Sequence, residues 1–91
     1  MLSDFALEVL GCVAHDYEAI QTIRGDLERD LDQTISENDL FAALANLVRA
    51  GLVDAFEYNP TAQAYEKISP SALTQGKEFW FLANQSGLAQ L

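Results

Sequence analysis

The clearest hydrophobic pattern in the chain lies between residues 36 and 53. Apolar residues recur there at helical spacing and share one face, namely Leu40, Phe41, Leu44, Leu47 and Val48. Ser36 is a good N-cap, and Gly51 can adopt the left-handed conformation that ends a helix. We therefore expect a helix over residues 36–50, followed directly by a strand.

Two further helices are expected before this stretch. Ser3 can cap the first helix, which we expect from Asp4 to about His15 with apolar residues on more than one side. The second is expected from about Tyr17, and its single apolar stripe consists of Ile20, Ile23, Leu27 and Leu31. A short turn over residues 32–35 then leads into the third helix.

Beyond residue 51 the pattern changes from helical spacing to alternation. Strands are expected over residues 52–58 and 64–69, joined by a turn at Asn59-Pro60, and a last strand is expected over residues 78–82. The predicted fold class is α+β, with three helices followed by a small antiparallel β-wing.

Short motifs accompany these elements. They are Leu10-Gly11 and Tyr17-Glu18-Ala19-Ile20 in the first two helices, Leu40-Phe41 followed by Leu44, Leu47 and Gly51-Leu52-Val53 around the third, and Phe79-Trp80-Phe81-Leu82-Ala83 with Gly87 at the end. They resemble winged helix-turn-helix domains, and PadR-type transcriptional regulators in particular. The closing motif is similar to the Tyr-Tyr-x-Leu-Thr-x-x-Gly of such wings, with Ala83 in place of the capping threonine and the glycine one residue farther on. The resemblance implies a winged-helix fold in a bacterial regulator.

Length and composition indicate the number of domains and the cellular location. The chain has 91 residues, which suits one domain over residues 1–91. No apolar run approaches the ~20 residues that span a bilayer, so we expect no membrane contact. The N-terminus lacks the basic region of a secretory signal, and the single cysteine cannot form an internal disulfide. We therefore expect a cytoplasmic protein.

The charge argues against simple DNA binding. A winged helix reads DNA with its third helix, and the positions expected to face DNA or a partner are Asn38, Ala42, Asn46 and Arg49, with Lys67 near the wing. Asn can pair with adenine and Arg with guanine. However, fourteen acidic against five basic residues give a formal net charge of -9, which repels phosphate backbones.

We therefore predict a small acidic interaction module that acts in bacterial transcription control through protein contacts. A basic protein is the expected partner, because the net charge favours cationic surfaces. The alternative is a PadR-like regulator that binds double-stranded DNA directly with helix 36–50 and the wing.

The aromatic residues Phe79, Trp80 and Phe81 indicate a second contact surface. Alternation along a strand turns the two phenylalanines to one side and Trp80 to the other, so both faces of the strand are apolar. One explanation is that the first helix and the C-terminal residues cover the second face. The other is a dimer or partner interface, and from it we predict a homodimer.

The sequence gives little support for a catalytic site or a metal-binding site. Cys12 and His15 are the only nucleophile and base of the usual kind, but Cys12 lies on an apolar helix face and no oxyanion-stabilising group is apparent. The spacing of Asp26, Glu28, Asp30, Asp32 and Glu37 resembles a calcium loop, yet Leu31 occupies the position where such a loop needs glycine. We expect no enzyme activity, no cofactor and no metal site.

Overall fold

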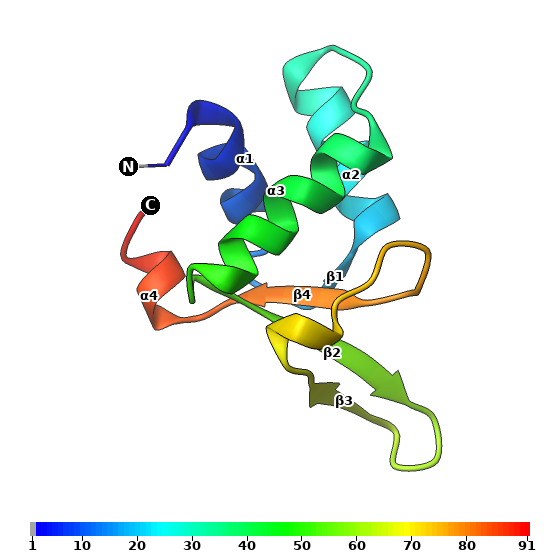
Figure 1. Ribbon diagram of the computed structural model, residues 1–91. Coiled ribbons are helices and arrows are strands. Elements are labelled where there is room, and N and C mark those ends of the chain that lie inside the picture. The colour runs from blue at the N-terminus through cyan, green and yellow to red at the C-terminus, as the bar shows by residue number, and fades with distance from the viewer. Residues whose placement is uncertain (1) are drawn as a thin grey trace.

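The computed structural model describes residues 2–91 and arranges them as a layer of helices over an antiparallel sheet (Figure 1). In chain order the elements are α1 (Asp4–Cys12), β1 (Glu18–Ala19), α2 (Ile20–Leu31), α3 (Glu37–Arg49), β2 (Val53–Asn59), β3 (Ala64–Lys67), the 3-10 helix η1 (Pro70–Ala72), β4 (Trp80–Ala83) and α4 (Gln85–Leu88). The predicted α+β class is confirmed. The predicted number of elements is too small, because β1, η1 and α4 were not expected.

The sheet has four strands in the order β1-β4-β2-β3, and every neighbouring pair is antiparallel. In its centre Ala55 lies opposite Phe81, and Phe56 lies opposite Trp80. Because side chains alternate along a strand, Ala55 and Phe81 point toward the helices, whereas Phe56 and Trp80 point away from them. The sheet therefore has a helix-side face and an outer face.

The predicted beginning and end of the third helix are confirmed. The Ser36 hydroxyl accepts a hydrogen bond from the Asp39 amide at 3.4 Å, and Gly51 has a φ of 78° just after the helix. Glycine adopts this left-handed conformation with the least steric strain, which suits it to the end of a helix. The chain then turns directly into β2.

The first two helices are shorter than predicted, because residues next to each of them form hydrogen bonds with β4 instead. α1 ends at Cys12, and the carbonyl of Val13 accepts a hydrogen bond from the Ala83 amide of β4 at 2.8 Å. α2 begins at Ile20 rather than near Tyr17, since residues 18–19 pair with β4 as strand β1. Contacts with a strand from the far end of the chain thus override local helical spacing.

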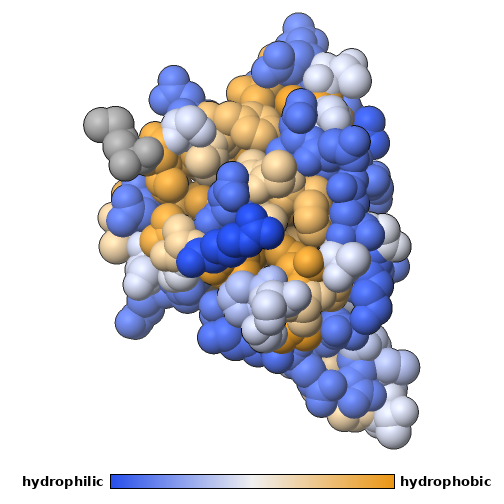
Figure 2. Space-filling model, in the orientation of Figure 1, coloured by the Kyte–Doolittle hydropathy of each residue, from blue (hydrophilic) through white to orange (hydrophobic). Residues whose placement is uncertain are grey.

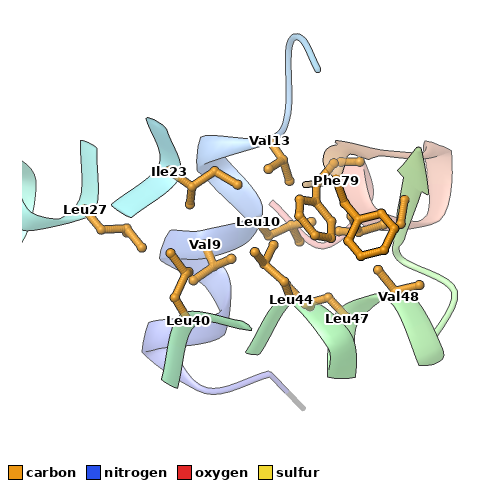
Figure 3. Packing of buried hydrophobic residues seen from close by; sticks show 14 of the residues in the cluster. Val9, Leu10, Val13, Ile23, Leu27, Leu40, Leu44, Leu47, Val48 and Phe79 are labelled. Carbon is orange, nitrogen blue, oxygen red and sulfur yellow. The ribbon is translucent and has the colours of Figure 1, made fainter. Parts of the chain in front are cut away.

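The hydrophobic core lies between the helices and the helix-side face of the sheet (Figure 3). It contains the predicted apolar stripes together with residues of the strands: Val9, Leu10, Val13, Ile23, Leu27, Ile35, Leu40, Leu44, Leu47, Val48, Val53, Ala55, Phe79, Phe81 and Ala83.

The turn between α2 and α3 is held by Arg24, whose Nε donates to the Ile35 carbonyl at 2.7 Å, and by Glu28, whose carboxylate accepts from the Ile35 amide at 2.8 Å. Two charged side chains of α2 therefore stabilise the fold.

The predicted turn at Asn59-Pro60 is confirmed. The side chain of Asn59 accepts hydrogen bonds from the amides of Thr61 and Ala62, at 3.0 Å and 3.2 Å. After β3 the chain passes through η1 and reaches β4 by a connection that lies beside α3. Within residues 2–91, no helix is long and apolar enough to cross a membrane.

Candidate functional site

Five aromatic side chains gather on the outer face of the sheet. We call this cluster the aromatic face, and its members are Tyr17, Phe56, Tyr58, Tyr65 and Trp80. Strand register brings them together: Tyr58 lies opposite Tyr65, and Phe56 lies opposite Trp80. Tyr17 joins them because it directly precedes β1, which pairs with β4. The strands β2, β3 and β4 and the residue before β1 thus contribute to one surface.

The rings of the aromatic face pack closely against one another. Tyr17 and Tyr65 are stacked with their ring centroids 4.2 Å apart and an interplanar angle of 12°. Tyr17 also meets Phe56 edge-on at 4.9 Å, and Trp80 meets Tyr65 at 5.5 Å. Such stacked and edge-on pairs are the favoured arrangements of aromatic rings. The cluster is therefore a preformed platform rather than a set of separate side chains.

Much of this platform is open to solvent. The exposed fractions of Tyr17, Tyr58 and Tyr65 are 36%, 41% and 38%, whereas Phe56 beneath them is 8% exposed. Within the described part of the chain, no hydrogen bond involves the three tyrosine hydroxyls or the indole nitrogen of Trp80. Large, half-exposed rings with unused polar groups are typical of protein interfaces.

Few charges border the aromatic face. Lys67 and Asp54 lie on the same side of the sheet as Phe56, and the Lys67 Nζ is 3.4 Å from a carboxylate oxygen of Asp54. Asp16, next to Tyr17, is exposed. The one lysine at this edge is thus already paired with a carboxylate, which leaves little positive charge on the surface.

The structure corrects the expected interface of Phe79, Trp80 and Phe81. Phe79 and Phe81 are 2% and 1% exposed and belong to the core, so only Trp80 can meet a partner on the outer face. Its neighbours there are Phe56, Tyr58 and Tyr65. The helix α1 does not cover this face, because it packs against α2 and α3. The alternation in residues 56–58 signals two of these aromatic neighbours, but Tyr17 and Tyr65 join only through the register of the strands.

The exposed side of α3 presents Asn38, Ala42, Asn46 and Arg49, as predicted. Asn38 is engaged by the connection before β4, because the Gln75 side-chain amide donates a hydrogen bond to it. Lys67 does not join this group, since it lies on the outer face of the sheet with Asp54. The residues expected to contact DNA or a partner therefore fall on two surfaces, and Arg49 is the only basic residue of α3.

The side on which α3 lies in front is mixed in character (Figure 2). Apolar surface over the helices is bordered by hydrophilic side chains, which dominate along the α2 side of the view. A shallow hollow of about 410 Å³ lies between the start of α1 and the turn before α3, and Phe5, Ile35, Ser36, Asp39 and Ala42 contribute to its lining. Its only charged lining residue is Asp39, so it offers no basic group to a phosphate.

Cys12 and His15 do not form a reactive pair. Cys12 ends α1 and is half-buried, while His15 is exposed in the following turn, and no hydrogen bond joins the two. Burial first, and then the charge of nearby carboxylates led by Asp26 and Asp30, raises the pKa of the Cys12 thiol to about 11. The thiolate, which is the nucleophile, is therefore scarce at neutral pH.

The acidic residues with calcium-loop spacing serve mainly as parts of a helix. Asp26, Glu28 and Asp30 lie on α2, where an EF-hand would need a loop. Glu28 pairs with Arg24 and accepts from the Ile35 amide, and Asp26 pairs with Arg29 at 3.0 Å. Among residues 2–91, no three His, Cys, Asp or Glu side chains gather closely enough to hold a metal ion.

Comparison with known proteins returned no match: no protein family, no curated protein and no solved structure is significantly similar to this chain.

Proposed function

We propose that this chain is a regulatory module of the winged-helix type, similar to the DNA-binding domains of PadR-type regulators, and that it acts through protein contacts on its aromatic face. Three helices followed by a β-hairpin and a closing strand agree with the resemblance noted in the sequence. Bacterial transcription control is the role that this resemblance implies. The observation that carries the proposal is the exposed platform of Tyr17, Tyr58, Tyr65 and Trp80.

The end of the chain adds support for the winged-helix assignment. In the family motif the capping threonine and the glycine are three residues apart. Asn84 and Gly87 have the same spacing, one residue later, and the Asn84 side chain accepts a hydrogen bond from the Gly87 amide at 3.0 Å. Asn84 therefore does the capping that threonine does in the motif, and one shift by a single residue accounts for both departures from it.

Protein contacts are favoured over duplex DNA because of the charges. Nonspecific attraction to DNA comes from Lys and Arg that neutralise phosphates. α3 offers Arg49 alone, and its first turn carries the carboxylates of Glu37 and Asp39. The alternative, direct DNA binding by α3 and the wing, is supported by the exposure of Asn38, Asn46 and Arg49. Such binding would have to overcome a net charge of -9.

Site-specific photo-crosslinking in living cells tests the proposal. A photoreactive phenylalanine derivative placed at Tyr58 reports on the aromatic face, and the same group at Ala42 reports on α3. We expect a discrete protein adduct from position 58 that disappears when Tyr65→Ala is added, and no adduct with DNA from position 42. DNA adducts from position 42, with no protein adduct from position 58, would overturn the proposal in favour of the alternative.

A further inference from the structure

We propose that the aromatic face binds an arginine-rich segment of the partner protein. This inference rests on the proposed function, because it names the chemistry of the partner that the aromatic face contacts. It goes beyond that function in stating which side chain the rings recognise.

The aromatic face has a preference for cations. The faces of aromatic rings carry partial negative charge and attract Lys or Arg side chains. The chain's own basic residues offer little competition for the rings, because four of the five are already paired with carboxylates. The pairs are Arg24 with Glu28, Arg29 with Asp26, Lys67 with Asp54, and Lys77 with Glu57. The net charge of -9 adds a long-range field that draws in a cationic segment.

The packing of the rings favours arginine over lysine. Tyr17 and Tyr65 stack on each other with their ring centroids 4.2 Å apart and an interplanar angle of 12°, so there is no space between these two rings for a cation to enter. A flat guanidinium can instead stack on the outward face of an exposed ring, whereas a compact, strongly hydrated ammonium gains less from such a contact. The hydroxyls of Tyr17, Tyr58 and Tyr65 can accept hydrogen bonds from a guanidinium fork, and Asp16, the residue before Tyr17 in the chain, is exposed and carries a negative charge.

Other occupants of the aromatic face fit less well. A second copy of this chain would bring another charge of -9 to the interface. Single-stranded nucleic acid also stacks bases on aromatic side chains, but it needs a positively charged groove to follow its backbone. Lys67 is the one basic residue here, and it is paired with Asp54. An arginine-rich segment satisfies both the aromatic and the electrostatic character of the surface.

The test is a fluorescence titration, since Trp80 is the only tryptophan of the chain and lies within the aromatic face. The probes are three capped peptides of equal length, with alternating Gly-Arg, Gly-Lys and Gly-Glu sequences. We expect the Gly-Arg peptide to change Trp80 emission and to bind about tenfold more tightly than Gly-Lys, with no response to Gly-Glu.

Variants of exposed residues locate the binding. Tyr65→Ala and Tyr58→Ala, each checked for folding by circular dichroism, should each weaken Gly-Arg binding about tenfold. Lys67→Ala should strengthen it, because a competing cation is removed. Asp30→Asn removes one negative charge on α2, away from the aromatic face, and is the matched control that should change affinity less than either tyrosine variant.

Three outcomes would overturn the inference. They are equal affinity for Gly-Arg and Gly-Lys, an unchanged affinity in both tyrosine variants, and sedimentation showing a dimer that Tyr65→Ala converts to a monomer. The last outcome would assign the aromatic face to a second copy of the chain. A protein adduct from position 58 combined with no arginine preference would reject this inference alone, whereas DNA adducts from position 42 with no protein adduct from position 58 would reject the proposed function.

Discussion

The two faces of the sheet use similar residues in opposite ways. On the helix side Phe81 is 1% exposed and Ala55 is 1% exposed, and both belong to the core. On the outer side Tyr58 is 41% exposed, although it comes from the same strand as Ala55. The helices cover only the first face. Aromatic content alone therefore does not identify a core. This domain has an exposed aromatic surface on the outer face of the sheet, in addition to the buried face that forms the core.

The largest expected effect comes from truncating the helix-side face. Phe81→Ala should lower the free energy of unfolding by about 3–5 kcal/mol, because it removes a fully buried ring and leaves a cavity. Urea denaturation followed by circular dichroism measures it. A loss below about 1 kcal/mol would mean that this face is not the main core, and the comparison would fail.

Gly87→Ala tests whether close packing extends to the end of the helix side. A methyl group at Gly87 would lie 2.1 Å from the Leu52 carbonyl oxygen, which belongs to the backbone and cannot easily move. We expect a loss of about 1–3 kcal/mol from this overpacking. Gly25→Ala is the matched control, since nothing lies within 4 Å of the added methyl group in α2, and it should raise stability by about 0.5–1 kcal/mol. Equal effects of the two substitutions would contradict the packing of α4.

A smaller effect is expected on the outer face. Tyr65→Ala removes an aromatic side chain that is 38% exposed, so it should cost less than about 1.5 kcal/mol, well below the cost of Phe81→Ala. The same denaturation experiment compares the two. If Tyr65→Ala proved as destabilising as Phe81→Ala, the aromatic face would be a second core and not a surface held ready for a partner.

The smallest effect concerns Glu18 of β1, at the edge of the sheet. Burial first, and then the charges of Asp26 and Asp16, raises the pKa of this carboxyl above its ordinary value of 4.5. A raised pKa in the folded state means that stability falls as the pH rises from the unfolded pKa through the folded one. Glu18→Gln should therefore stabilise the protein slightly at neutral pH, and the gain should disappear below about pH 4. Urea midpoints at both pH values measure it, and a larger gain at acid pH would contradict the assignment.

Local signals made much of the fold predictable. The third helix follows from its apolar spacing, its Ser36 cap and the Gly51 stop, all of which lie within one stretch of chain. β1 was missed because two residues carry no pattern of their own, and they become a strand only by pairing with β4. α4 was missed although its cap, Asn84, is visible in the sequence.

The candidate site was predictable only in part. Alternation correctly separated Trp80 from its phenylalanine neighbours, yet all three were assigned to one interface. Tyr17 and Tyr65 could not be placed beside Trp80 from the sequence, since the register between β2 and β3 and the position of β1 decide it. The α3 positions were correctly expected to be exposed, because helical spacing determines them locally.

The claim that this chain does not act by binding DNA is tested most directly by fluorescence anisotropy. A labelled random duplex is titrated with the wild-type chain and with Arg49→Ala and Tyr65→Ala. We predict binding weaker than ~10⁻⁴ M at physiological salt, with no difference among the three proteins, because α3 offers only Arg49 to the phosphates. Micromolar binding that weakens steeply with added salt, and is lost in Arg49→Ala but kept in Tyr65→Ala, would contradict the account.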